Sequence, residues 1–95
     1  MSPPTDFEIA VMRVIAASWN GCPDVGEVRL AVSRRIEKST GRKPHQAAVS
    51  CNITKFAWRE TYVRIGHGNS RFIVLTPAGK TWVDEHPAEP PVHAP

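Results

Sequence analysis

Few features of this 95-residue sequence point to a secreted, membrane-bound or metal-dependent protein. Its two cysteines, Cys22 and Cys51, are too few for a disulfide framework, and we expect both to be free thiols. The four histidines share no metal-ligand spacing with them. No apolar run approaches the ~18–20 residues of a membrane span, and the N-terminus lacks the basic start and apolar block of a signal peptide. We therefore expect a cytoplasmic protein with no membrane contact, no metal and no other cofactor.

Motifs of catalysis are missing as well. The sequence has no Gly-rich phosphate loop, no conspicuous Ser/His/Asp or Cys/His spacing, and no pair of carboxylates in a plausible site. We therefore do not expect an enzyme. The chain is long enough for one small domain with one core and too short for two. We expect that domain at residues 5–85, between a disordered N-terminus at 1–4 and a Pro-rich disordered tail at 86–95.

Positive charge is abundant, and it is concentrated in the middle of the chain. Residues 29–80 contain eleven lysines and arginines but only two acidic residues, a net charge of +9, whereas residues 1–28 and 81–95 each carry −3. A polyanion would therefore be attracted to the middle segment. The alternative is a solvated basic face without a partner.

The first expected helix begins at Thr5-Asp6-Phe7-Glu8, a capping-box pattern. One apolar face consists of Phe7, Val11, Val14 and Ile15. A second face on nearly the opposite side needs another neighbour, either the C-terminal helix or a second copy of the chain. We assign this second face to a homodimer interface of Ile9, Met12, Ala16 and Trp19. The alternative is that Ile9 and Met12 are scattered surface residues.

Two further helices follow. The second begins at Asp24 and has a core stripe of Val25, Val28, Val32 and Ile36. A basic connection leads to a third helix that Pro44 or His45 opens, with a core stripe of Val49, Ile53 and Phe56. The residues that face away from this stripe are Ala47, Cys51, Thr54, Lys55 and Trp58. We expect Trp58 to fold under the following segment or to pack on the first helix.

A short hairpin should come next. Two runs rich in β-branched and aromatic residues, 61–65 and 71–75, are separated by a Gly-His-Gly-Asn turn that permits positive φ at a hairpin tip. After the second run, Thr76 is a suitable N-cap and Pro77 suits the first position of a helix. We expect Trp82, one turn further, to pack inward.

This order of a striped helix, a basic hairpin and the Leu75-Thr76-Pro77-Ala78-Gly79 motif resembles the winged helix-turn-helix superfamily of DNA-binding domains. The resemblance implies an α+β fold with a three-helix core, a two- or three-stranded hairpin wing and a C-terminal helix. Two features depart from the family pattern: no glycine precedes the hairpin at 60–63, and the connection at 38–44 is longer than a tight helix-turn-helix turn. A weaker likeness, to the N-terminal winged-helix module of Mrr-type restriction proteins, would tolerate the long connection.

The resemblance also implies a homodimeric regulator of transcription that binds double-stranded DNA, with the third helix in the major groove and the hairpin on the adjacent minor groove. The residues expected to read base edges are Gln46, Ser50, Asn52, Thr54 and Lys55. The residues expected to contact phosphates are Arg34, Lys38, Arg42, Lys43 and Arg59. The wing contributes Arg64, His67, Asn69 and Arg71.

A winged-helix fold does not by itself establish DNA binding. The alternative is a protein–protein interaction module, such as an adaptor or an inhibitor of a nucleic-acid enzyme. Such a module would show little salt-dependent binding to generic duplex. Its function would also survive the substitutions Lys55→Glu and Arg71→Glu.

Overall fold

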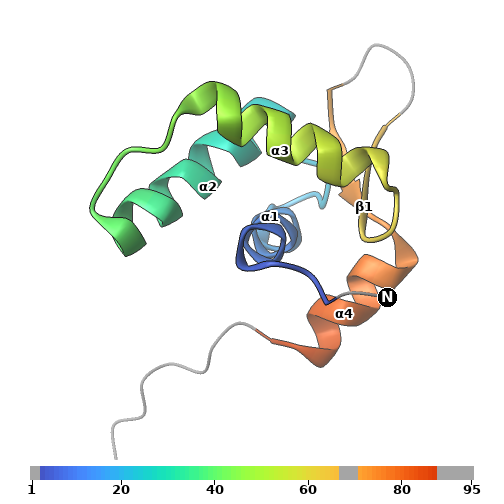
Figure 1. The fold of residues 1–95 in the computed structure, drawn as a ribbon. Helices are drawn as coiled ribbons and strands as arrows, with labels where there is room; N and C mark the ends of the chain where they lie inside the picture. The colour runs from blue at the N-terminus through green and yellow to red at the C-terminus, as the bar shows by residue number, and fades with distance from the viewer. Residues whose placement is uncertain (1–2, 67–70, 88–95) are drawn as a thin grey trace, which may run out of the picture.

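Helix α1 (Asp6–Ala17) lies at the centre of the fold, with α2 (Val25–Thr40) and α3 (Gln46–Trp58) on one side and α4 (Pro77–Glu85) on the other (Figure 1). Strands β1 (Val63–Ile65) and β2 (Ile73–Leu75) come between α3 and α4 in the chain. The computed structural model describes residues 3–66 and 71–87, and in this part the chain is a small α+β fold of four helices and a two-stranded antiparallel sheet. The element order confirms the predicted succession of three helices, a hairpin and a C-terminal helix.

Helices α1 and α2 begin at side chains that cap free backbone amides. Thr5 and Glu8 form the predicted capping box: Thr5 Oγ1 accepts from the Glu8 amide at 3.2 Å, and Glu8 Oε1 accepts from the Thr5 amide at 2.9 Å. At the start of α2, Asp24 Oδ1 accepts from the Gly26 amide at 2.7 Å. His45 precedes α3 and makes no side-chain capping bond. The N-termini of these helices therefore lie close to where the sequence places them.

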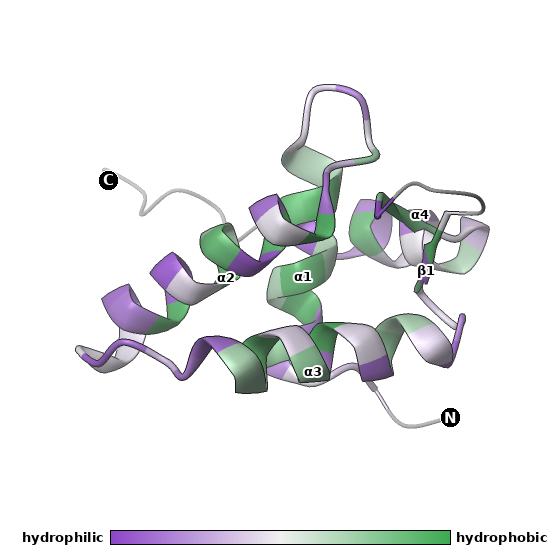
Figure 2. Cartoon of the chain, turned by 90° about the horizontal axis from the view of Figure 1, so that it is seen from above, coloured by the Kyte–Doolittle hydropathy of each residue, from purple (hydrophilic) through white to green (hydrophobic). Residues whose placement is uncertain are grey.

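The core surrounds α1 and contains the apolar stripes predicted for α1, α2 and α3. Figure 2 shows α1 as largely hydrophobic and lying between its neighbours. The buried apolar side chains are Val11, Met12, Ile15, Val28, Val32, Val49, Ile53, Phe56, Ala57, Val63 and Ile73. Trp82 of α4 packs against this cluster, as predicted. The helical stripes were predictable because core residues three or four apart in a helix share one face.

The two strands pair with Val63 opposite Leu75 and Ile65 opposite Ile73. These four side chains belong to the core or pack against it, whereas Arg64 is exposed. One face of the hairpin therefore packs on the helices, as the alternation of side chains along the strands predicts.

The chain just before α2 runs beside β2. The Val25 amide donates to the Arg71 carbonyl at 2.8 Å, and the Ile73 amide donates to the Pro23 carbonyl at 3.0 Å. These bonds fix the start of α2 against the hairpin.

Hydrogen bonds also attach the start of α4 to the chain before β1. The Thr76 amide donates to the Tyr62 carbonyl at 3.0 Å, and Thr76 Oγ1 donates to the Thr61 carbonyl at 2.7 Å. The same hydroxyl accepts from the Gly79 amide at 3.1 Å, so Thr76 is the predicted N-cap, with Pro77 in the first turn. The strands are shorter than the runs 61–65 and 71–75 predict, since β1 begins at Val63 and β2 at Ile73.

The structure corrects the second apolar face of α1. The helix ends at Ala17, so the helical spacing that grouped Trp19 with this face does not apply. Met12 is fully buried and Ile9 packs against the core, because α4 packs against α1. Met12 therefore cannot form a homodimer interface, and the assignment of Ile9 loses its basis. Ala16 and Trp19 are exposed, and a homodimer stays a prediction.

Candidate nucleic-acid interface

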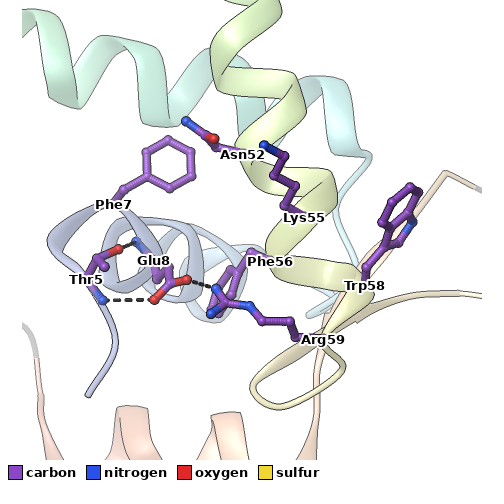
Figure 3. A pocket seen from close by; sticks show the side chains of 8 residues that line it. All are labelled: Thr5, Phe7, Glu8, Asn52, Lys55, Phe56, Trp58 and Arg59. Carbon is purple, nitrogen blue, oxygen red and sulfur yellow. Dashed lines mark hydrogen bonds and ion pairs between the residues drawn. The ribbon is translucent and has the colours of Figure 1, made fainter. Parts of the chain in front are cut away.

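The exposed surface of α3 lies between two hollows. Its outermost side chains are Ala47, Cys51, Lys55 and Trp58. The hollow toward the sheet, here the hairpin groove, has a volume of about 300 Å³ and is lined by Val25, Ser50, Thr54, Ile65 and Arg71. The hollow toward the start of α1, here the aromatic cleft, has a volume of about 580 Å³ and is lined by residues that include Phe7, Glu8, Asn52, Lys55 and Trp58 (Figure 3).

Four of the five predicted base-reading residues lie on the two flanks of α3. Ser50 and Thr54 are half-buried in the hairpin groove, where the Thr54 hydroxyl donates to the Ser50 carbonyl at 3.0 Å. Asn52 and Lys55 are exposed in the aromatic cleft. The structure therefore does not bring these four residues together in one row.

The fifth residue, Gln46, connects α3 to α2. Its amide nitrogen donates to Ser33 Oγ at 3.2 Å and to the Pro44 carbonyl at 3.4 Å. Ser33 is 7% exposed, and a buried hydroxyl without a partner is unfavourable. Gln46 therefore joins two helices, a contact that helical periodicity alone does not indicate. Its side chain is exposed, and the base-reading role stays a prediction.

Arg59 is held against α1. Its guanidinium forms an ion pair with Glu8 and lies 5.4 Å from the centre of the Phe56 ring (Figure 3). The side chain of Arg59 is 60% exposed, yet a carboxylate already balances its charge. Arg59 therefore joins the end of α3 to the start of α1, an ion pair that the sequence did not predict, and its phosphate contact stays a prediction.

The remaining cations predicted to contact phosphates lie at the end of α2 and in its connection to α3. They are Arg34, Lys38, Arg42 and Lys43, and together with Arg35, which was not among the predicted contacts, these exposed residues form what we call the basic arm. Glu37 is the only acidic residue within 34–43, and the pair of Arg59 with Glu8 is the only ion pair within the described ranges. The positive charge of the arm is therefore not neutralised by contacts in that part of the chain. The connection projects from the body of the fold (Figure 1).

The structure describes two of the four predicted wing residues. Arg64 on β1 and Arg71 before β2 are both exposed, and Arg71 also lines the hairpin groove. His67 and Asn69 lie outside the described residues. Two arginines of the hairpin are thus accessible to a partner that approaches α3 from the hairpin side.

Trp58 is another residue that sequence reasoning placed wrongly. We expected it to be covered by the hairpin or by α1, but its side chain is 77% exposed. A signal was present in the sequence, because helical spacing puts Trp58 among the residues that face away from the core stripe. Phe7, predicted as a core residue of α1, is half-buried and lines the aromatic cleft.

In residues 3–66 and 71–87, no three His, Cys, Asp or Glu side chains lie close enough together to hold a metal ion. No helix in the same ranges has both the length and the apolar character needed to cross a membrane.

Comparison of the chain with protein-family models, with curated proteins and with solved structures finds no match.

Proposed function

We propose that this chain is a winged helix-turn-helix domain that binds double-stranded DNA and regulates transcription by occupying its site. The order of three helices, a hairpin and α4 supports this proposal, as does the cap that Thr76 forms within the Leu-Thr-x-x-Gly motif. In the proposed complex, α3 enters the major groove and the hairpin lies along the adjacent minor groove. The basic arm contacts phosphates and fixes the register of the domain on the duplex.

The basic arm is the observation that carries the proposal. Its five cations are exposed, and within the described part of the chain no ion pair neutralises them. Such a surface attracts a polyanion and releases counterions when it binds one. The arm lies in α2 and the connection to α3, on the side of α1 opposite to α4 (Figure 1). In this proposal the duplex contacts both the arm and the exposed surface of α3.

The hairpin groove supplies the base-reading side of this interface. Ser50 and Thr54 have hydroxyls that accept or donate at several base edges, and Arg71 beside them can bind a phosphate or enter a minor groove. Asn52 and Lys55 are exposed on the opposite flank of α3, and they read the edge of the same major groove in this proposal.

The proposal is tested by fluorescence anisotropy with a labelled mixed-sequence duplex of about 20 base pairs, in about 50 mM and about 200 mM salt. With about six phosphate contacts, the affinity should fall roughly a thousandfold between the two salt concentrations. Arg71→Glu should weaken binding about tenfold at the lower salt. The matched control is Lys80→Glu, which makes the same charge change at an exposed position of α4 and should change the affinity less than about twofold. Absence of duplex binding at low salt, or equal losses for the two variants, would contradict the proposal.

A protein–protein interaction module is the second candidate. Large apolar side chains at the surface favour it, because Trp58 is 77%, Leu30 48% and Phe72 45% exposed. Exposed aromatic groups of this kind are enriched where proteins bind other proteins. This candidate predicts that the chain does not bind generic duplex at low salt, so the same titration separates it from the first.

A further inference from the structure

Duplex binding gives Asn52 and Lys55 of the aromatic cleft a role, but it does not explain why Phe7 and Trp58 lie beside them. Figure 3 shows Phe7 at one side of the cleft, Asn52 and Lys55 directed toward it from α3, and Trp58 at the outer rim on the other side of Lys55. A cationic side chain thus lies between two aromatic rings that come from different helices. The rings are accessible, since Trp58 is 77% exposed and Phe7 is half-buried.

Lys55 is the free cation of the cleft. Arg59 lines the same cleft but forms an ion pair with Glu8, and Glu8 Oε1 also accepts from the Thr5 amide at 2.9 Å. Both oxygens of Glu8 therefore have partners in its own chain, and Arg59 offsets the negative charge that would oppose an incoming anion. The Lys55 ammonium and the Asn52 amide remain for a ligand.

These groups match the parts of a nucleotide. A base offers a flat face for an aromatic ring, its edge offers donors and acceptors for an amide such as that of Asn52, and its phosphate is an anion for Lys55. In a duplex the face of each base is covered by its neighbours in the stack, so aromatic side chains can stack only on unpaired bases. The volume of about 580 Å³ is within the range of sites that hold small molecules or single groups of a polymer.

We propose that the aromatic cleft binds single-stranded nucleic acid, with one base stacked on Trp58, an adjacent base against Phe7, and the intervening phosphate on Lys55. Stacking on an aromatic ring tolerates any base, so this site adds affinity for unpaired strands and little sequence preference. Asn52 and Lys55 take part in both proposed complexes, but only the single-strand complex uses the rings of Trp58 and Phe7. The proposal therefore does not depend on duplex binding.

The test is a titration of the full chain with a labelled oligothymidine of about 12 nucleotides, followed by anisotropy. Trp58→Ala should weaken binding about tenfold, and Trp58→Phe, which keeps a ring, should weaken it by less than about threefold. Trp19→Ala is the matched control, because Trp19 is 95% exposed and follows the opposite end of α1, roughly 18 Å along the helix from the cleft. That variant should bind as the unchanged chain does. Because both tryptophans are exposed, neither substitution should disturb the fold, and circular dichroism checks this.

Intrinsic fluorescence gives a second reading of the same contact. In a Trp19→Phe background the emission comes from Trp58 and the half-buried Trp82, and the oligonucleotide should quench it. The further change Trp58→Phe should remove most of that quenching. Equal affinities of the Trp58→Ala variant and the unchanged chain would overturn the proposal. Quenching by an acidic, aromatic-rich peptide but not by oligothymidine would also overturn it and would assign the cleft to a protein partner.

The duplex titration and the single-strand titration test the two proposals separately. Loss of single-strand binding in the Trp58→Ala variant, with duplex affinity changed less than about twofold, supports the cleft as a separate site. Equal losses for both ligands would show that Trp58 belongs to the duplex interface, which overturns the cleft proposal and leaves the duplex proposal intact. Single-strand binding in a chain that does not bind duplex supports the cleft and contradicts the duplex proposal.

Discussion

Gly79 in α4 lies so close to the carbonyl oxygen of Tyr62 that a β-carbon at position 79 would overlap with it. The same carbonyl accepts the Thr76 amide at 3.0 Å, so the first turn of α4 is held directly against the chain that precedes β1. This contact is a steric reason for a glycine at the last position of the Leu75-Thr76-Pro77-Ala78-Gly79 motif. A larger residue would push α4 away from Thr61 and Tyr62, to which its N-cap Thr76 is hydrogen-bonded.

The first prediction concerns that glycine. Alanine is the better helix former by about 1 kcal/mol, so helix propensity alone would make Gly79→Ala stabilising. We expect the overlap with Tyr62 to dominate and to lower the free energy of unfolding by about 1–3 kcal/mol, as chemical denaturation measures it. Ala78→Gly at the adjacent exposed position is the control and should cost only about 1 kcal/mol of propensity. A Gly79→Ala variant as stable as the unchanged chain would contradict the steric argument.

The second prediction concerns the cap of α4. Thr76 Oγ1 donates to the Thr61 carbonyl and accepts from the Gly79 amide, and Thr76 is only 8% exposed. Thr76→Val keeps the shape and removes both bonds, so the free energy of unfolding should fall by about 1–2 kcal/mol. Thr76→Ser keeps the hydroxyl and should lose less than half of that. Equal losses for the two variants would show that packing of the methyl group matters more than the cap.

The third prediction concerns Glu60, which lies two residues after the end of α3 and has a φ of +52°. A non-glycine residue in this left-handed conformation costs about 1–2 kcal/mol, whereas glycine adopts it freely. After the greater chain entropy of glycine in the unfolded state is subtracted, Glu60→Gly should raise the free energy of unfolding by about 0.5–1 kcal/mol. Glu60→Ala removes the same charge without relieving the conformation and should give no gain. Stabilisation by the alanine variant would attribute the effect to charge.

The core of this fold could be predicted from the sequence because it depends on local periodicity. Val28 and Val32 in α2, and Val49 and Ile53 in α3, are spaced so that any regular helix puts each pair on one face. The caps at Thr5 and Thr76 were predictable for the same reason, since each acts within three residues of itself.

The features that the sequence did not predict depend on which helices and strands pack against each other. Met12 was expected at an interface between copies, but α4 packs against α1 and Met12 is fully buried. Gln46 and Arg59 were expected to be free, but each pairs with a residue far away in the chain, Ser33 and Glu8 respectively. No spacing along the sequence records such pairs. The candidate site was therefore predictable in its exposed cations and not in its engaged polar groups.

The fourth prediction separates the two roles considered for Gln46. If it joins the helices, Gln46→Ala and Ser33→Ala should each lower the free energy of unfolding by about 0.5–1.5 kcal/mol. Their effects should couple by about 0.5 kcal/mol or more in a double-mutant cycle, because the residues share two hydrogen bonds. Selection from random duplexes should give the same preferred bases for Gln46→Ala as for the unchanged chain. A changed base preference would restore Gln46 as a base reader.

The fifth prediction distinguishes cations that contact phosphates from cations that are engaged within the protein. For duplex binding, each phosphate contact adds about 0.9 to the slope of log affinity against log salt concentration. Arg34→Ala, Lys38→Ala and Arg42→Ala should therefore each lower the slope by about 0.9, because these side chains of the basic arm are exposed and lack ion pairs within the described ranges.

Arg59→Ala should lower the slope much less, since the guanidinium of Arg59 is paired with Glu8. Lys80→Ala on α4 should leave the slope unchanged. The same slope for the Arg42→Ala variant and the Lys80→Ala variant would show that the arm does not contact the duplex, whatever the affinity of the domain for it.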